Sequence, residues 1–597
     1  HLLPVATDET LITKTVPVFL TRQGKHDFKI KVPKGASPYR LTLEMTANPT
    51  WYAVLALPGL TTPATENAID ISAAFYTNTL AAFIAKANPE IARAIQEWSG
   101  KPATAITSPL SQNEELKSIL LQLTPWVAEA QEQTDRMRSL STLFDENRQK
   151  YLAATHLGKL GQLQNADGGW AWFKGFRSSP FITLNVLQTF ARLTELGALE
   201  SDQSAKEMQA KALRYLDQNI VENHRNDTSV GFNDVLYLRV RSAYRDIPLG
   251  DALAAHKALL QNVKRSWPRF DEYAKALAAV ALYRYGERQT AVEILSSLRE
   301  FATITPGQGM FWANNRTSAF ANSAVLVHAS IMAAFHEIEG DTPDTDRMKQ
   351  WLLCQKQTRD WGDAPSSVEA IHALLLTGSD QLASDERLTV SVNKKRLEAT
   401  PEDARLGYVK HAVPADKLTA KTSTVSVEKQ SDSPSWGGVY LQYFQKMDET
   451  GANSAGVAIE KKLYLKQTSG RGETLMPLDS LDGSRLRIGN RLTVRVTIRS
   501  DRDMEFVHLR DLRAANLEPV SQQPGTRRQG SLLYYQETRD IATNFFFDVL
   551  PRGTHILEYD VWISQAGDYT DGAATLQCVY APQFSANSDG GSISVPQ

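Results

Sequence analysis

The segment from Lys159 to Phe173 constrains the fold more than any other part of the sequence. Before it, apolar side chains recur at helical spacing through residues 137–163, which predicts a helix that ends here. The glycines of Asp167-Gly168-Gly169 tolerate a positive φ, so the chain can reverse tightly while Trp170 packs back as a large apolar side chain. Helix is expected to resume near Thr183. The sequence therefore predicts a pair of helices closed by this turn.

A helix pair closed by Gln-x-x-Asp-Gly-Gly-Trp is the building unit of α/α toroids, in which inner and outer rings of helices bury their apolar faces against each other. The residues that fit this pattern are Gln164, Asp167, Gly168, Gly169 and Trp170. Related turns occur at residues 307–312 and at Trp361-Gly362-Asp363. Three related turns indicate a repeated architecture, and a Gly-Gly-Trp turn serves packing more often than ligand binding.

Strand patterns flank this helical block on both sides. Alternation of apolar and polar residues predicts strands at residues 28–32, 41–45, 388–392, 424–427 and 439–444. A few strands cannot form a stable sheet alone, so the strands before the block are expected to pair with those after it. The helical block is therefore predicted to be inserted between two halves of one β-domain.

A last module is predicted to open near Val457. Residues 492–498 alternate after a Gly489-Asn490 turn, and further strand patterns follow, which is typical of a β-sandwich. The tail after Asn587 is rich in Ser and Gly, and its end is expected to fray.

The predicted fold class is thus multidomain α and β: an α/α toroid inserted in a β-sandwich domain and followed by a C-terminal β-sandwich. The predicted boundaries are 1–56 for the first part of the split β-domain, 57–380 for the toroid, 381–456 for the second part and 457–597 for the last sandwich.

Composition excludes several classes of function. A net charge of −2 on 597 residues gives no reason to expect nucleic acid as a partner. No run of about 18 apolar residues occurs, so no membrane-spanning segment is expected. The sequence begins at His1 without a Met or a signal segment, and we expect it to be a piece of a longer protein. The only cysteines, Cys354 and Cys578, exclude a disulfide scaffold and a cysteine-based zinc site.

The motifs of known toroid enzymes are missing. The sequence has no Asp-x-Asp-Asp acid cluster of the terpene-cyclase type, and Leu352 stands where a zinc-binding prenyltransferase has an Asp two residues before its Cys. His328, His336 and His372 lie on helical stretches without Cys or carboxylate partners at ligand spacing, so we expect each to be half-buried or on the surface. We predict no catalytic residue, no metal and no cofactor, although scattered acid pairs leave a polysaccharide-cleaving toroid open.

Several short motifs follow one another in a characteristic order. They are Ala56-Leu57-Pro58, Phe75 to Ala81, Gln164 to Trp172, Gly309 to Trp312, Gly553 to Tyr559, and Tyr580-Ala581-Pro582. In this order, over nearly the whole chain, they resemble the C-terminal half of the alpha-2-macroglobulin and complement family, in its bacterial branch. The resemblance implies a thioester-domain-like toroid, a split CUB-like β-domain around it, and a macroglobulin-like or receptor-binding-like sandwich at the end.

Members of this family that react covalently carry Cys-x-Glu-Gln at the start of the first toroid helix, where the Cys sulfur and the Gln side chain condense into a thioester. Counting back from Phe75-Tyr76 places Asn67 at the Cys position and Asp70 at the Gln position. An Asn amide and an Asp carboxylate cannot form a thioester. Because no Cys occurs in the first 353 residues, a small shift in this alignment does not change the conclusion.

The resemblance therefore implies a thioester-less, non-enzymatic protein of the bacterial cell envelope, anchored as a lipoprotein through upstream residues, that traps proteases noncovalently. The bait segment that a protease cuts is expected upstream of His1, so this piece alone is not expected to inhibit proteases. Two alternatives stay open. One is a scaffold or adhesion protein that binds other envelope proteins. The other is a toroid lyase or cyclase, which predicts a deep pocket at one end of the barrel lined by acids, Tyr or His.

Overall fold

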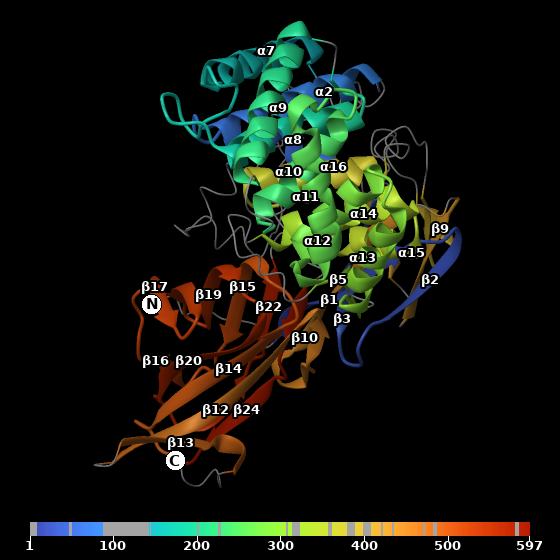
Figure 1. Cartoon of the computed structure of the whole chain (residues 1–597). Coiled ribbons are helices and arrows are strands. Elements are labelled where there is room, and N and C mark those ends of the chain that lie inside the picture. The colour runs from blue at the N-terminus through green and yellow to red at the C-terminus, as the bar shows by residue number, and fades with distance from the viewer. Residues whose placement is uncertain are drawn as a thin grey trace. The chain divides into compact units, whose positions relative to one another are not determined.

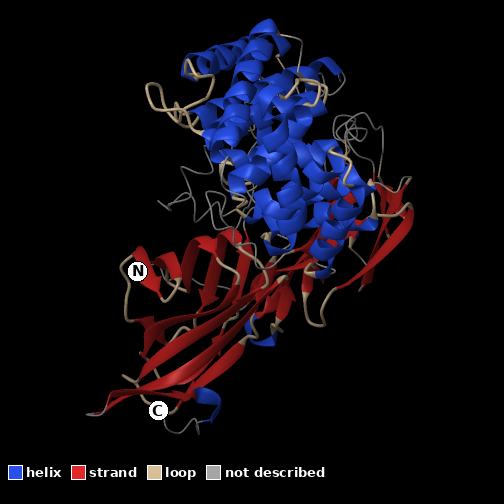
Figure 2. Cartoon of the chain, viewed as in Figure 1, coloured by secondary structure: helices blue, strands red, loops and turns tan. Residues whose placement is uncertain are grey.

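The computed structural model describes most of the chain. The residues described are 9–46, 51–87, 143, 145–199, 202–224, 229–305, 308–312, 323–355, 361–378, 388–397, 408–418, 422–430, 432, 435–469, 472–480, 486–578 and 584–597. Gly307 and Tyr580-Ala581-Pro582, which belong to the sequence motifs above, lie outside these residues. The chain forms two compact units (Figures 1 and 2), one built mainly of helices from residues between 51 and 378 and one of strands from 9–46 and 388–597.

The helical unit is an α/α toroid. Six helices form a closed inner ring, in which each contacts the next and the last contacts the first: α2 (Ala68–Ala87), α8 (Pro180–Glu195), α10 (Phe232–Arg241), α12 (Glu272–Arg284), α14 (Ala324–Glu339) and α16 (Ala364–Leu376). Among the described residues, the helices that pack outside this ring are α7 (Glu146–Leu163), α9 (Gln203–Asn223), α11 (Leu253–Ser266), α13 (Arg288–Glu300) and α15 (Pro343–Gln355). The short α1 (Trp51–Ala56) contacts α16.

Burial separates the two rings. Inner helices such as α8 and α12 are buried over most of their length, whereas outer helices such as α9 and α13 bury only one stripe. An apolar stripe on an amphipathic outer helix needs a partner, and the inner ring supplies it.

Two local details of the helical unit differ from the sequence prediction. Helix α8 begins at Pro180, ahead of the predicted Thr183, because Ser179 caps it through Ile182 N–H and Pro suits a first helical turn. The second related turn is part of a hairpin of two short strands, β4 (Thr303–Thr305) and β5 (Gly309–Phe311). A short sequence of this kind carries too little periodicity to distinguish a strand from a turn.

The strands before and after the toroid pair, as predicted. Strand β10 (Ser435–Lys446) lies between β1 (Glu9–Leu20) and β3 (Ser37–Thr46), and β1 pairs with it antiparallel from Glu9 opposite Lys446 to Leu20 opposite Ser435. Strand β8 (Tyr408–Pro414) completes this sheet beside β3. The toroid is therefore an insertion within one β-domain.

A second sheet completes the sandwich of this split β-domain. It consists of β2 (Gly24–Lys31), β9 (Thr422–Lys429), β6 (Thr389–Val392) and β7 (Lys395–Leu397). Alternate residues from both halves of the sequence fill the core, among them Ile12, Leu41, Val390, Val425 and Val439. Since neither half has enough strands for a sandwich, the domain depends on segments about 400 residues apart.

The last module is a larger β-sandwich. One sheet has the order β13 (Gly472–Pro477), β12 (Val457–Ser469), β14 (Arg491–Ser500), β20 (Gly553–Ile563) and β16 (Leu517–Pro519). The other has the order β11 (Asn453–Ala455), β23 (Ser585–Asn587), β22 (Ala574–Cys578), β15 (Met504–Leu512), β19 (Ala542–Leu550), β18 (Leu532–Thr538) and β17 (Gly525–Gln529). A two-stranded ribbon is formed by β21 (Gly567–Asp571) and β24 (Gly591–Val595).

The structure corrects the expectation about the C-terminal tail and refines the one about membrane-spanning segments. The tail predicted to fray forms β24, which pairs with β21 and buries Ile593 and Val595 in the core of the last sandwich. Among the described residues, α2 alone is long and apolar enough to cross a membrane, and 78% of its apolar window is buried inside the helical unit. Helix α2 is packed as a core helix of the inner ring.

Candidate functional site at the start of helix α2

Asn67 is the residue that caps helix α2. Its Oδ1 accepts the backbone N–H of Asp70 at 2.8 Å, and its own carbonyl oxygen accepts the N–H of Ile71 at 3.0 Å. Asn is among the best N-cap residues because its side-chain oxygen satisfies one of the unpaired N–H groups of the first turn. Local helix chemistry therefore accounts for an Asn at this position.

Asp70 closes the same turn from the other side. Its Oδ2 accepts the side-chain N–H of Asn67 at 3.0 Å, and it also accepts Thr65 N–H at 3.0 Å and Thr65 Oγ1 at 2.6 Å. A carboxylate in the first turn is further favoured by the helix dipole. The two positions that the resemblance assigns to a thioester thus hold a hydrogen-bonded pair of side chains.

The Gln164 to Trp170 turn is a rigid structural unit. Gln164 Nε2 donates to the carbonyl oxygens of Gly168 and Met208, both at 2.9 Å, and so ties the turn to α9. Asp167 Oδ1 accepts Gly169 N–H at 3.0 Å and Ser178 Oγ at 2.7 Å. All polar groups of the motif named here bond within the protein, which agrees with a packing role.

The glycines of this turn are required by space as well as by conformation. Gly168 has φ +91°, and a Cβ there would collide with the carbonyl oxygen of Lys211. A Cβ on Gly169 would lie 2.6 Å from the Cβ of Ser178. Gly309 repeats the arrangement, with φ +78° and the carbonyl oxygen of Arg347 in the way of a Cβ.

Each of the three related turns also contains a buried Trp that bonds to the preceding outer helix. Trp170 is fully buried, and its indole Nε1 donates to Leu160 O at 2.8 Å, the last turn of α7. Trp312 donates to Leu298 O at 2.8 Å and Trp361 to Leu352 O at 2.9 Å, in both cases on the preceding outer helix. The repetition predicted from the sequence is therefore present in the hydrogen bonding.

The turn also connects to the start of α2. The carbonyl oxygen of Trp172, two residues beyond the motif, accepts Ala68 N–H at 3.0 Å. The first N–H of α2 is thus satisfied by a segment about 100 residues away in the sequence. This bond fixes the capped turn of Asn67 and Asp70 against the turn motif.

A cavity of about 270 Å³ opens at the end of the toroid where the inner helices begin. Its walls come from the first turns of the six inner helices and from Trp172, and they include Ile69, Phe181, Phe232, Asp271, Tyr273, Leu326, Asp363 and Pro365. The two carboxylates are N-caps: Asp271 Oδ1 accepts Ala274 N–H and Asp363 Oδ1 accepts Ser366 N–H, both at 2.8 Å. The cavity is mainly apolar, and of the groups that the lyase or cyclase alternative predicts its wall has Tyr273 and these two capping carboxylates.

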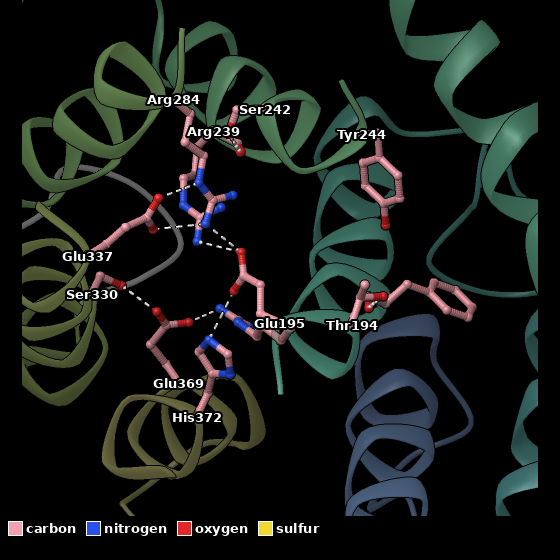
Figure 3. A network of polar contacts seen from close by, with 12 residues as sticks. Thr194, Glu195, Arg239, Ser242, Tyr244, Arg284, Ser330, Glu337, Glu369 and His372 are labelled. Carbon is pink, nitrogen blue, oxygen red and sulfur yellow. Dashed lines mark hydrogen bonds and ion pairs between the residues drawn. The ribbon is translucent and has the colours of Figure 1, made fainter. Parts of the chain in front are cut away.

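Acidic residues do converge inside the toroid, at a place the sequence did not suggest, and there they are paired with arginines (Figure 3). Arg284 binds Glu337 through Nε at 2.6 Å and Glu195 through Nη2 at 2.6 Å. Arg192 forms an ion pair with Glu369, which also accepts Ser330 Oγ at 3.0 Å. Because these carboxylates are at most 23% exposed and are each bonded to a guanidinium, they form a structural network.

Burial and charge act against each other in this network. Burial alone would raise the pKa of Glu195, but Arg239, His372 and Arg284 outweigh it and hold this pKa well below its ordinary value. Burial lowers the pKa of Arg192 to about 10. Burial also lowers the pKa of His372, although Glu195 Oε2 lies 3.2 Å from its Nε2.

The expectation for the histidines was wrong in two of three cases. His328 and His372 are fully buried, whereas His336 is partly exposed. His328 is accommodated because its Nε2 lies 2.9 Å from Met348 O and its ring packs 4.2 Å from that of Trp351. Among the residues that the structure describes, no group of three or more His, Cys, Asp or Glu could hold a metal ion. Cys354 and Cys578 are both buried and are not joined in a disulfide.

Fold and site together define a multidomain protein in which an α/α toroid interrupts one β-sandwich and a second β-sandwich follows. The last sandwich can be assigned further, because residues 456–583 match the family model of the bacterial alpha-2-macroglobulin MG10 domain. This match confirms the resemblance of the chain to the C-terminal half of a bacterial alpha-2-macroglobulin. No curated protein matches the sequence.

Solved structures of bacterial alpha-2-macroglobulins are similar to the chain at low identity. The native Escherichia coli protein, spanning domain MG7 to the C-terminus, has 13% identity and a TM-score of 0.37, with 98% of this chain and 82% of that one covered. The trypsin-activated Escherichia coli protein has 14% identity and a TM-score of 0.43, with 99% of this chain and 36% of that one covered. The Salmonella protein reacted with methylamine has 15% identity and a TM-score of 0.35, with 99% of this chain and 34% of that one covered. The chain thus spans about a third of the two longer structures.

Proposed function

We propose that this chain is part of a thioester-less alpha-2-macroglobulin-like protein that entraps proteases noncovalently in the bacterial cell envelope. The observation that carries the proposal is the hydrogen-bonded pair of Asn67 and Asp70 at the start of α2. These side chains stabilise the helix start, and they cannot form a thioester because neither has a sulfur atom. Any protease would then be held by surface contacts alone.

The positions of the two cysteines support the same proposal. Cys354 lies in α15 and Cys578 in β22, and both thiols are buried. A buried thiol in apolar surroundings is poorly reactive. The proposal therefore does not move the covalent chemistry to another Cys of this chain.

The proposal also assigns no enzymatic activity to the toroid. The cavity at the start of the inner helices has mainly apolar walls, and Asp271 and Asp363 in it are used as helix caps. General acid and base catalysis needs carboxyl groups that can exchange protons with a substrate. The paired carboxylates around Arg284 are likewise committed to ion pairs.

The boundaries predicted from the sequence are part of the proposal: a split CUB-like domain in 1–56 and 381–456, a thioester-domain-like toroid in 57–380, and a macroglobulin-like sandwich in 457–597. Anchoring as a lipoprotein and a bait segment are assigned to residues of the longer protein outside this chain.

The test uses the full-length gene product and a protease in slight excess. We expect the protease to co-elute with the protein in size-exclusion chromatography, to keep cleaving a small peptide substrate, and to lose activity toward a large protein substrate. In denaturing electrophoresis the two should separate completely. Failure of the protease to co-elute would contradict trapping, and pull-down of other envelope proteins by the same product would favour the scaffold alternative.

A further inference from the structure

The last sandwich buries a cluster of charged groups between its two sheets. Lys461 lies on β12 and Asp511 on β15, which belong to different sheets, and Asp571 ends β21. The side chain of Lys461 is 4% exposed, that of Asp511 0% and that of Asp571 9%. Lys461 therefore reaches across the core from one sheet toward the other.

The nitrogen of Lys461 has more acceptors around it than hydrogens. Its Nζ donates to Leu512 O at 2.8 Å, to Gly572 O at 2.9 Å and to Asp571 Oδ1 at 3.0 Å. Asp511 Oδ1 lies 2.8 Å from the same Nζ as a fourth oxygen neighbour. An ammonium group has three hydrogens, so Nζ cannot give each of these four oxygen atoms a hydrogen of its own. The amine of Lys461 and the carboxylate of Asp511 are thus held in direct contact.

We propose that Lys461 and Asp511 condense into an intramolecular amide bond that links the two sheets of the last sandwich. The Nζ of Lys461 forms a bond to Cγ of Asp511, and the bond between Cγ and Oδ1 breaks. Two hydrogens of the ammonium leave with Oδ1 as water, and the third stays on the amide nitrogen. An ammonium and a carboxylate thereby become a neutral amide and one water, without any oxidant or further reactant.

The neighbouring groups are placed to assist both halves of this step. Asp571 contacts Nζ and can carry protons from it to the departing oxygen of Asp511. The hydroxyl of Tyr559 donates to Asp511 Oδ2, which becomes the amide oxygen, so the same bond stabilises negative charge there when Nζ adds.

Burial and neighbouring charges set the protonation states from which the step starts. Burial raises the pKa of Asp571, and the negative charge of Asp511 raises it further. Burial also raises the pKa of Tyr559 well above its ordinary value, so its hydroxyl stays a donor. Burial alone would lower the pKa of Lys461, but Asp511 and Asp571 outweigh that effect and raise it. Lys461 therefore rests as an ammonium, and Nζ must first give a proton to a neighbouring carboxylate before it can attack.

Burial also favours the product over the ion pair. Two charges taken out of water carry a desolvation penalty, which a neutral amide largely avoids. Fixed contact between the reacting groups replaces a bimolecular encounter, and the closed core limits the return of water to the amide. The link would hold β12 to β15 even if the rest of the sandwich loosened.

The mass of the intact 597-residue chain, measured under denaturing conditions, tests this directly. We expect a mass below that of the sequence by one water, about 18 Da. Proteolytic digestion should then give a branched peptide in which Lys461 is joined to Asp511. A full sequence mass, with linear peptides covering both residues, would overturn the proposal and leave a structural ion pair.

A cyclic imide would give the same loss of mass and must be distinguished from the amide. Asp571 precedes Gly572, and an Asp-Gly pair can lose one water by forming a cyclic imide on its own. Hydroxylamine opens an imide but leaves an amide intact. Loss of the mass difference on hydroxylamine treatment would therefore overturn the proposal, and so would a branch point at Asp571.

Variants assign the roles within the cluster. Lys461→Met removes the nucleophile and Asp571→Asn removes the proton carrier, so both should have the full sequence mass. Lys466→Met is the matched control, because Lys466 lies on the same strand and pairs with Asp560 on β20 at 3.1 Å, outside the cluster. It should keep the loss of one water. A lighter mass in Lys461→Met would contradict the assignment.

Discussion

Asn67 Nδ2 lies 3.0 Å from Asp70 Oδ2 in the first turn of α2, and Asn67 Oδ1 accepts the N–H of Asp70 at 2.8 Å. Two residues three positions apart are thus joined by two hydrogen bonds, one between their side chains and one from the backbone of Asp70 to the side chain of Asn67. The resemblance assigns a covalent bond between side chains at these two positions in reactive family members. In this chain the same spacing serves to start a helix.

Removal of the cap should destabilise the helical unit modestly. Asn67→Ala deletes the acceptor of Asp70 N–H and should lower the free energy of unfolding by about 1 kcal/mol. Asn67→Ser keeps a capping oxygen and should stay close to the wild type. Urea denaturation followed by the helical circular-dichroism signal measures both. Equal stability of the Ala variant and the wild type would contradict the capping role.

The turn motif offers a matched pair of glycines. Gly168 (φ +91°) and Gly175 (φ +87°) have nearly the same conformation, but only a Cβ at Gly168 meets a neighbour, the carbonyl oxygen of Lys211. Gly175→Ala should therefore cost about 1 kcal/mol for conformation alone. Gly168→Ala should cost about 3 kcal/mol, because the backbone must also move. Equal losses in urea denaturation would show that the close approach is unimportant.

The buried ion pairs predict that removal of a single charge destabilises the folded protein strongly. Arg284→Met leaves Glu337 without its guanidinium partner and removes one of the two guanidinium partners of Glu195, and should reduce the free energy of unfolding by about 3 kcal/mol. Lys150→Met breaks the exposed pair with Glu146, 2.9 Å apart, and should cost at most about 0.5 kcal/mol. If the two variants lose a similar free energy of unfolding, the buried network contributes no more to stability than the exposed ion pair does, which would contradict this prediction.

The buried His328 predicts that the stability of the protein depends on pH. Burial lowers its pKa from 6.5 to about 4 in the folded protein, so between these values the unfolded chain binds more protons. Stability should therefore fall as pH drops from 7 to 4, by about 3 kcal/mol for this residue. His328→Gln removes the titration, so the wild type should lose about that much more than the variant over the same range. Parallel pH profiles would contradict the depressed pKa.

Local signals made the toroid predictable from the sequence. Glycines that require a positive φ, a capping Asp and a Trp that packs back are read from neighbouring residues, so the turn at Gly168 and its relatives were found without tertiary information. Strand patterns on both sides of the helical block likewise indicated that strands before the toroid would pair with strands after it, as β3 does with β10. Of the candidate site, the sequence supplied Asn67 and Asp70 but not their hydrogen bonds to each other.

The buried charges were missed because their partners are distant in the sequence. Arg192 and Glu369 belong to α8 and α16, and each alone is indistinguishable from a residue on a solvated helix face. One signal was available: Lys461 stands at an inward position of β12, between Ile459 and Leu463 in an alternating apolar series. An amino group at such a position needs a buried partner, which only the fold supplies.

Treatment of this chain with methylamine, followed by intact mass measurement and thiol titration, tests most directly the claim that it stores no activated acyl group. A thioester would take up one amine and release one thiol. We predict that the mass and the number of thiols stay the same before and after treatment. A gain of one methylamine together with one new thiol would contradict the account.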